Sequence, residues 1–448
     1  MSTVDEAAFD VVVVGGGPAG LAATLAAARN GSRTLLVERY GFLGGELATG
    51  LPILTFHDFN GKQVVKGVGQ EIVDRLAAEG GSFGHVRAPG THVYTWTPSY
   101  PEIFKYVAQE MVLESGAQLL LHSFVTGAEM DDDRLAGVVV HNKTGRRVYR
   151  ARCVVDTTGD GDVAALAGAP FEKGRPEDGR LQTTTLMFAI GNVDVQTAAE
   201  SVRGSPEQPV RMGDAQGQWI RVLGNFGPWQ KFVEEEKLFH QKNQSIAMFS
   251  LRDGEVILNT SKVIDVDGTN AESLTRGEIE ARRQVLAIAR FLRRHVPGFE
   301  RSHLAWTAPH LGIRETRRIV GEHVLTLEEI MAGRKPADTV ACSSYGIDVH
   351  NPTGAVGAVK QIDTRLGYYG IPYGCLVPKR VDGLLAAGRC ISCTHLALGS
   401  VRVIAVCFAT GQAAGTAAAL SVAGAMAPRR LDVGRLRAIL REQNAVID

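Results

Sequence analysis

The 448-residue sequence has no excess charge of either sign, because 48 lysines and arginines are balanced by 48 aspartates and glutamates. A chain without a net field is not attracted as a whole to nucleic acid or to an anionic membrane, so we expect neither as a partner. The N-terminal segment has no basic region, and the first apolar run is too short to cross a bilayer. These absences predict a cytoplasmic protein whose binding specificity is local.

Cysteine is also scarce, with six residues in the whole chain. Without an export signal this number predicts reduced thiols and no disulfide framework. Cys390 and Cys393 form a CxxC pair, for which three interpretations are open. A metal or iron–sulfur site normally needs four ligands, and the other cysteines are isolated, so we predict no metal site. A redox-active dithiol is the second interpretation, and a pair of thiols that pack without reacting is the one we favour.

Glycine, in contrast, is abundant, with 51 residues that gather in short loops. The first of these loops follows the apolar strand predicted at residues 9–14 and precedes a helix predicted at about 21–29. Gly15, Gly17 and Gly20 fit the pattern GxGxxG, in which the glycines permit a tight turn, close approach of a pyrophosphate and close helix packing. A second strand is predicted at residues 34–37.

Glu38 closes this second strand, at the place where an acid bonds ribose hydroxyls. The order of strand, glycine turn, helix, strand and acid predicts a dinucleotide-binding unit. An acid at this position would repel an adenosine 2′-phosphate, which argues against NADP.

Three further segments carry a resemblance to a known family. The loop "ERYGFLGGELATG" contains a double glycine after the acid, and residues 153–170 and 381–420 look like two later flavin motifs. In this order they resemble the FAD-binding domain of the flavoprotein superfamily that includes fumarate reductase flavoproteins and glutathione reductase. Residues 310–326 and 368–390 resemble the bacterial FAD-dependent oxidoreductase family within it. The resemblance implies FAD as the cofactor.

The motifs and the resemblance together give the expected FAD-binding residues. One departure concerns Gly388, which is followed by Arg389 where many relatives place an aspartate for the ribityl chain. Asp160 or backbone groups then take that role, while Arg389 either meets the pyrophosphate or pairs with an acid. The full expected set is Gly15, Gly17, Pro18, Ala19, Gly20, Glu38, Arg39, Gly44, Gly45, Glu46, Val125, Thr158, Gly159, Asp160, Gly388, Arg389, Ser400 and Val401. The carboxy-terminal helix of the last motif is predicted to begin near Val401.

The fold class that follows is α/β, with a Rossmann-like FAD-binding domain, made of a parallel sheet with a small antiparallel sheet, interrupted by an α+β substrate domain. We assign residues 1–50, 100–182 and 370–430 to the FAD-binding domain, 51–99 and 183–369 to the substrate or cap domain, and 431–448 to a C-terminal tail helix. Helices are predicted at 101–114 and at about 273–295. No second complete glycine motif is present, so we expect no separate NAD(P)H domain and take the substrate as the source of reducing equivalents.

Catalysis by a flavin dehydrogenase needs a base and a cation that orients an anionic substrate. The candidates are Arg314 for a substrate carboxylate, and His395 as base and Arg402 near the redox centre, with Tyr345, His350 and Tyr373 as weaker candidates. Arg314 has a salt bridge, and His395 a structural hydrogen bond, as the alternative role.

The expected function is removal of hydride from a small polar metabolite, with electrons passed to an external acceptor. Reduction of an activated C=C bond and non-redox hydratase or lyase chemistry are the alternatives. A homodimer is the ordinary expectation for such an enzyme.

Overall fold

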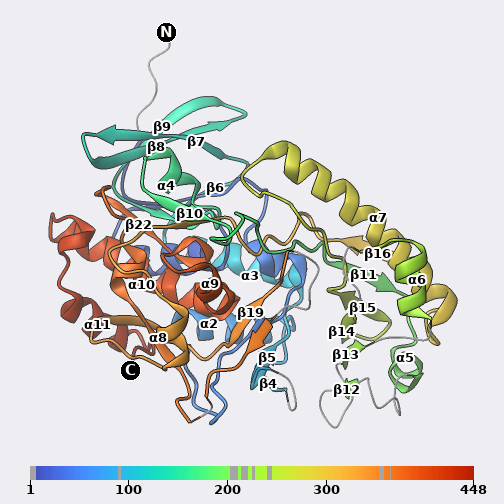
Figure 1. Cartoon of the computed structure of the whole chain (residues 1–448). Coiled ribbons are helices and arrows are strands. Elements are labelled where there is room, and N and C mark those ends of the chain that lie inside the picture. Colours follow the sequence, from blue (N-terminus) through green and yellow to red (C-terminus); the bar gives the residue numbers. More distant parts are fainter. Residues whose placement is uncertain are drawn as a thin grey trace.

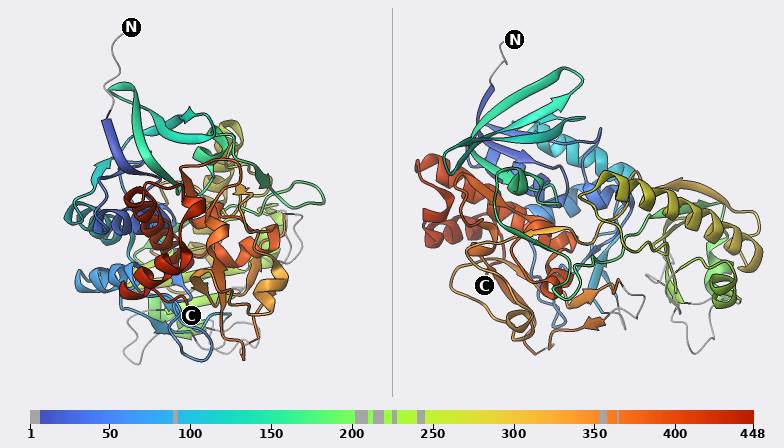
Figure 2. Two further views of the ribbon diagram at one scale, coloured as in Figure 1. Left: turned by 90° about the vertical axis from the view of Figure 1, so that its left-hand side faces the viewer. Right: turned by 45° about the horizontal axis from the view of Figure 1, so that its top comes forward.

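Two β-sheets organise the chain in the computed structural model, which describes residues 7–88, 92–201, 210–212, 220–224, 228–239, 245–352, 358–363 and 365–448. Figure 1 shows the larger sheet with the helices of both chain ends, and the smaller sheet beside the long helix α7 (Ala271–His295). The two groups of elements also separate in the right-hand view of Figure 2. A cavity between them holds the residues discussed below.

The larger sheet has seven strands and is mainly parallel in its centre. Strand β9 (Gly145–Asp156) pairs in parallel with β1 and β22, and antiparallel with β8. Its length of 12 residues lets one strand belong to both arrangements, so the predicted parallel and antiparallel sheets are continuous. The other members are β1 (Ala7–Val14), β2 (Thr34–Val37), β6 (Gln118–Leu120), β7 (Phe124–Asp131), β8 (Arg134–Asn142) and β22 (Leu384–Ala386). The predicted α/β class is confirmed.

Helices α1 (Pro18–Arg29) and α10 (Ile404–Ala423) pack against each other through their backbones. A Cβ atom on Gly411 would lie 2.2 Å from the carbonyl oxygen of Ala19, and one on Gly415 would lie 2.1 Å from that of Ala23. Because both contacts advance by four residues, the two helices run parallel. Glycine is required at both positions.

Helix α10 is apolar on every side, and by length and composition it could span a bilayer. In the fold, 94% of its apolar window is buried, which is the environment of a central core helix. The predicted start of this helix near Val401 is wrong. The short helix α9 (His395–Val401), capped by the Thr394 hydroxyl, ends there, and α10 begins at Ile404.

The smaller sheet is antiparallel and forms the centre of the α+β part. Its strands, in spatial order, are β12 (Val210–Met212), β13 (Ile220–Gly224), β14 (Ile246–Arg252), β15 (Glu255–Leu258), β11 (Phe188–Gly191) and β16 (His303–Thr307). Helix α7 packs on it through a buried face that includes Val285, Ile288 and Phe291. Helices α5 (Val195–Ser201) and α6 (Trp229–Glu235) complete this part.

The remaining elements surround the cavity or cover the first core. Phe56, Ile72, Cys342 and Ile362 share one hydrophobic cluster with α1 and α10. Parts of the segments predicted as substrate domain, 51–99 and 183–369, therefore belong to the core of the nucleotide-binding half. These elements are β3 (Ile53–Leu54), α2 (Val68–Ala78), β4 (Val86–Arg87), β5 (Thr95–Thr97), α3 (Pro101–Glu114), α4 (Asp162–Leu166), β10 (Phe171–Lys173), β17 (Arg317–Ile319), α8 (Leu327–Met331), β18 (Thr339–Ser343), β19 (Ile347–Val349), β20 (Ala358–Lys360), β21 (Tyr369–Pro372) and α11 (Val433–Glu442), with 3₁₀ turns at Gly45–Thr49, Tyr373–Leu376, Gly388–Cys390 and Pro428–Arg430.

The contact between α1 and α10 yields a prediction about stability. Gly411→Val forces a side chain into the Ala19 backbone, and overpacking of this kind costs about 1–3 kcal/mol or more. We expect a lower urea midpoint in equilibrium unfolding. Gly434→Ala in the exposed first turn of α11 is the matched control, since its Cβ meets only a side-chain oxygen and helix propensity improves. Equal midpoints for Gly411→Val and the unsubstituted protein would contradict the assigned packing.

Candidate active site

A cavity lies where the carboxyl ends of β1, β2, β9 and β22 face the smaller sheet. One part is lined by the glycine-rich segments and another by charged side chains from residues 310–350 and 402.

The glycine loop forms one wall of the cavity. Gly15, at φ 101°, lies so close to Thr157 that a Cβ would be 2.6 Å from the Thr157 carbonyl oxygen. Gly20 packs against Gly15, with 1.7 Å between a built Cβ and the Gly15 oxygen. Gly17 is open, since a Cβ there meets nothing closer than the Gly45 Cα at 3.9 Å. Gly17 is also the N-cap of α1 and has no side-chain cap, so the positive end of the helix faces a site suited to phosphate.

Glu38 holds this wall in place. Its carboxylate accepts hydrogen bonds from the backbone N–H of Gly16 at 2.6 Å and of Tyr40 at 2.7 Å. The side chain still lines the cavity, and a carboxylate has further acceptor sites beyond the two in use. Glu38 can therefore fix the loop and accept a ribose hydroxyl at the same time.

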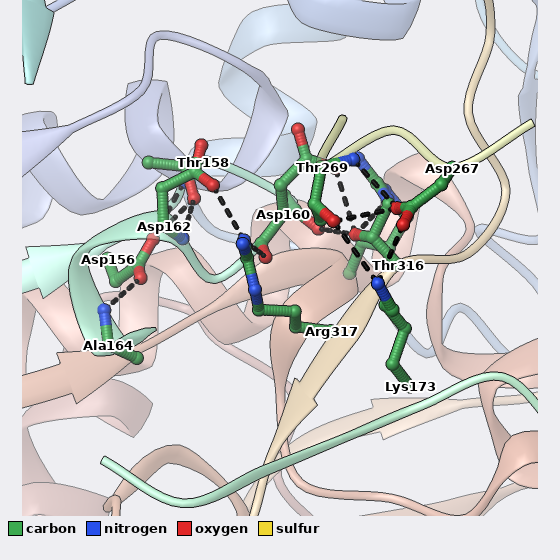
Figure 3. Close-up of polar contacts among 12 residues, drawn as sticks. Asp156, Thr158, Asp160, Asp162, Ala164, Lys173, Asp267, Thr269, Thr316 and Arg317 are labelled. Carbon is green, nitrogen blue, oxygen red and sulfur yellow. Dashed lines mark hydrogen bonds and ion pairs between the residues drawn. The ribbon is translucent and has the colours of Figure 1, made fainter. Parts of the chain in front are cut away.

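The loop after β9 adjoins the glycine loop in the cavity wall and is held by a polar network (Figure 3). Asp156 accepts hydrogen bonds from Thr158 and from the Ala164 N–H, and burial raises the pKa of its carboxyl to about 6. Asp160 accepts from Arg389 at 2.8 Å and from the Thr316 hydroxyl at 2.9 Å. Of the two roles open to Arg389, pairing with an acid is the one that the structure shows.

The charged part of the cavity has two buried guanidinium groups. Arg314 donates to the carbonyl oxygen of Thr183 at 2.8 Å, and burial, reinforced by nearby Arg402, lowers its pKa to about 10. Arg402 donates to the carbonyl oxygen of Asp348 at 2.9 Å, and its Nη2 lies 3.7 Å from the carboxylate Oδ2 of the same residue. The buried Nε of Arg402 has no hydrogen-bond partner in the described part of the chain.

Asp348 is the centre of the charged part. Burial would raise the pKa of its carboxyl, but the contacts with His350, Arg402 and Arg314 hold that pKa well below the usual range. His350 Nε2 lies 3.4 Å from Asp348 Oδ1, and the Tyr345 hydroxyl donates to Oδ2 at 3.1 Å. Arg314, Arg402 and Lys262 thus interact with the carboxylates of Asp348 and Glu46, and three cations with two carboxylates leave an excess positive charge here.

The match to a family model decides the family, because it runs from residue 10 to residue 440 and the model is described as FAD dependent oxidoreductase. The chain belongs to the FAD-dependent oxidoreductase family. FAD is its cofactor, and the residues described above fit it. The open surface at Gly17, the uncapped N-terminus of α1 and the spare acceptor sites of Glu38 suit a pyrophosphate and a ribose, and the buried His310 Nε2 lacks a partner in the residues that the structure describes.

The chain is also similar to individual proteins of known name. The chain is 31% identical over 235 residues to the thiamine thiazole synthase of Aeropyrum pernix. The aligned region covers 47% of this chain and 79% of that protein. The chain is 28% identical over 172 residues to the thiamine thiazole synthase of Methanococcus vannielii, covering 35% and 58% respectively. A solved structure of a triple mutant of the flavin-dependent brominase Bmp2 superposes with a TM-score of 0.51 at 13% identity, over 97% of this chain and 85% of that chain. The last similarity shows a shared fold.

Most of the predicted cofactor-binding residues of this oxidoreductase line the cavity. They are Gly15, Gly17, Pro18, Ala19, Glu38, Arg39, Gly45, Glu46, Val125, Thr158, Gly159, Asp160, Gly388 and Arg389. Gly20 and Gly44 lie behind the wall. Ser400 and Val401 are also outside the cavity, since Ser400 is buried in α9 and bonds the Tyr369 hydroxyl at 2.6 Å. Val403, Ile404 and Cys407, from the start of α10, line the cavity instead.

The predicted catalytic residues divide in the same way. Arg314, Arg402, Tyr345 and His350 line the cavity. His395 does not, because it is buried with its Nδ1 2.8 Å from Glu315 Oε1. This is the structural role that was the alternative for His395.

Tyr373, one of the weaker candidates, is buried and donates to the Pro428 carbonyl, away from the cavity.

Two lining residues escaped the sequence analysis. Asp348 and Asn259 line the cavity and were not predicted. Asp348 lies within the short strand β19 and Asn259 follows β15, and neither belongs to a motif that could have marked it.

The CxxC pair lies in the core and outside the cavity. Cys390 and Cys393 are both buried, and burial raises the pKa of Cys393 to about 12 and that of Cys390 well above the usual value. Thiols in this state form almost no thiolate near neutral pH, and the thiolate is the reactive form. Within the described ranges, no group of three or more histidine, cysteine or acidic residues is placed to hold a metal. The geometry favours two packed, unreactive thiols.

This assignment predicts that the thiols of the native protein react slowly with Ellman's reagent. All six cysteines are buried, so we expect little colour until denaturant is added and six equivalents afterwards. Rapid native reaction of two thiols, abolished by Cys390→Ser, would instead favour a redox-active pair.

The position of Glu38 predicts its effect on cofactor binding. Glu38→Gln keeps one carbonyl acceptor but loses the charge, and a hydrogen bond to a charged group contributes about 1.5–3 kcal/mol. We expect the FAD dissociation constant of the apoprotein, measured by flavin fluorescence, to rise by about tenfold or more. Glu110→Gln on α3 is the control and should leave the constant unchanged. An unchanged constant in Glu38→Gln would remove Glu38 from the cofactor site.

Proposed function

We propose that this FAD-dependent oxidoreductase removes hydride from a small polar metabolite that carries a carboxylate, and that an external acceptor takes the electrons. The excess of cations over carboxylates around Arg314 supports the proposal. These side chains line the same cavity as the cofactor-binding residues. A guanidinium group matches a carboxylate in a bidentate geometry, and the unpartnered Nε of Arg402 is a donor ready for such a ligand.

Each group in the cavity then has a stated task. Bound FAD supplies two-electron redox chemistry. Arg314 and Arg402 bind and orient the substrate carboxylate. Apolar side chains on the cavity wall, among them Leu51, Leu54 and Met187, keep water away from the reacting carbon.

His350 replaces His395 as the candidate base. A neutral imidazole whose Nε2–H points at Asp348 Oδ1 keeps Nδ1 as a proton acceptor. Asp348 is the positioning residue, because it fixes this tautomer and orients the ring. His350 accepts the hydroxyl or amine proton of the substrate.

A reductase of an activated C=C bond is the second candidate function. Burial and Arg402 lower the pKa of Arg314 to about 10, which makes this guanidinium a better proton donor than an exposed arginine. In this direction Arg314 would protonate the substrate carbon.

The first experiment follows the visible flavin spectrum under anaerobic conditions. Lactate, malate and glycine are compared with the neutral lactamide and propane-1,2-diol. We expect bleaching by at least one of the acids and by neither neutral compound. Bleaching by the neutral compounds alone would contradict the proposal. Reoxidation of dithionite-reduced enzyme by fumarate or crotonate, without bleaching by any acid, would favour the reductase.

The anion-binding role of the guanidinium groups is tested separately with oxalate as the probe. Oxalate bound near the cofactor perturbs the flavin absorbance, which gives a dissociation constant. Arg402→Gln removes one charge-assisted contact of about 1.5–3 kcal/mol, so we expect that constant to rise about tenfold or more. Arg290→Gln on the exposed side of α7 is the matched control. Equal oxalate affinity in both variants would exclude Arg402 from the anion site.

A further inference from the structure

His350 is surrounded by more positive than negative charge. Arg314, from the loop before β17, and Arg402, from the junction of α9 and α10, act on it electrostatically, and Asp348 contacts it from its own segment. The backbone N–H of His350 donates to Gln182 Oε1 at 3.2 Å, which fixes the residue against the segment before β11. Three elements far apart in sequence thus bring two cations and one carboxylate to a single imidazole.

Lys262 and Tyr345 also belong to the polar surroundings of the cluster, and Glu46 acts electrostatically on Arg314. Tyr345 bonds Asp348 and lies 3.2 Å from His92 Nε2. Lys262, which follows β15, interacts electrostatically with both Arg314 and Asp348, and burial lowers its pKa to about 8. At about pH 5 it remains protonated.

This charge balance makes His350 a weak base in the ligand-free cavity. Burial, followed by the field of Arg314, lowers the pKa of His350 to about 3 in spite of Asp348. A general base works best when its pKa lies near the working pH. The imidazole is therefore neutral and correctly oriented, but has little affinity for a proton.

We propose that the anionic group of the bound substrate, held by Arg314 and Arg402, itself turns His350 into an effective base. The inference rests on the proposed function, since it requires an anionic ligand on the two guanidinium groups. Their charge is offset when the anion binds, and the imidazolium form of His350 is no longer opposed. The O–H or N–H bond of the substrate then breaks, its electron pair stays on the substrate atom, and the proton forms an N–H bond at His350 Nδ1.

The consequence is a coupling between substrate charge and chemistry. A neutral analogue that fits the cavity leaves His350 weakly basic and is not deprotonated. The same two arginines would thus select substrates twice, once in binding and once in the proton transfer. Linkage also requires a measurable effect in binding alone, because raising the pKa of a group on ligand binding draws protons from solution.

The test is calorimetry of oxalate binding to the FAD-loaded protein at about pH 5, in two buffers that differ in ionisation enthalpy. His350 is neutral at this pH without ligand, so we expect uptake of about half a proton per oxalate bound. His350→Gln should bind oxalate without this uptake. His323→Gln, a half-exposed histidine near α8, is the matched control and should retain it.

A second measurement on the unsubstituted protein does not depend on any variant. If binding takes up a proton, the oxalate dissociation constant must rise with pH, by up to about tenfold per unit between the ligand-free and ligand-bound pKa of His350. A dissociation constant that, expressed for the oxalate dianion, is independent of pH from 4 to 6 would overturn the inference.

The outcomes separate the inference from the function on which it rests. Oxalate binding without proton uptake overturns the activation of His350 and leaves the carboxylate site intact. Uptake that persists in His350→Gln assigns the proton to another group and overturns the role of His350. Failure of oxalate to bind at all overturns both the carboxylate site and the inference.

Discussion

The backbone contact between α1 and α10 is the constraint on which the active site depends. Gly411 and Gly415 let α10 lie directly on the carbonyl groups of Ala19 and Ala23. Because the helices are parallel, their N-terminal ends reach the cavity together. The glycine loop near residue 17 and the junction near residue 402, almost a whole chain apart in sequence, thereby become neighbours. Any larger side chain at this contact would separate the cofactor wall from one of the two guanidinium groups.

The two parts of the cavity differ in how completely their charged groups are paired with other groups of the fold. In the cofactor part, Glu38 is bonded to two backbone N–H groups and Asp160 to Arg389, so each charge has its partner within the fold. In the substrate part, Arg402 keeps an unpartnered buried Nε, and such a group costs about 1–3 kcal/mol. A ligand with an acceptor group recovers this cost on binding. The cofactor part is therefore rigid, whereas the part around Arg402 keeps a donor that can bind an anion.

The sequence predicted those features that depend on local spacing. The strand at 34–37 and the helix at 101–114 have the predicted bounds, because apolar periodicity and turn residues determine them locally. The glycine loop follows from the same logic. Ser400 and Val401 were placed on the cavity in error, since Thr394 caps a separate short helix and shifts the start of α10 by three residues. Asp348 lies in the short strand β19 and Asn259 follows β15, and only tertiary packing brings them to the cavity.

Two histidine–carboxylate pairs show why the candidate base proposed above could not be chosen from the sequence. His395 and Glu315 lie with Arg318, whose guanidinium group also donates to the carbonyl oxygens of Cys393 and Gly174. Each charged group in that cluster has a hydrogen-bond partner within it, and His395 does not reach the cavity. The cluster therefore stabilises the structure around the cavity. His350 and Asp348 have the same chemistry but face two arginines and an open volume. Residue type is equal in the two pairs, while charge balance and access differ, and these properties arise only when the chain is folded. A structural cluster is stable when every charged group is paired within the protein. The site proposed around His350 instead needs positive charge that the protein does not pair, because an anionic substrate is to neutralise it.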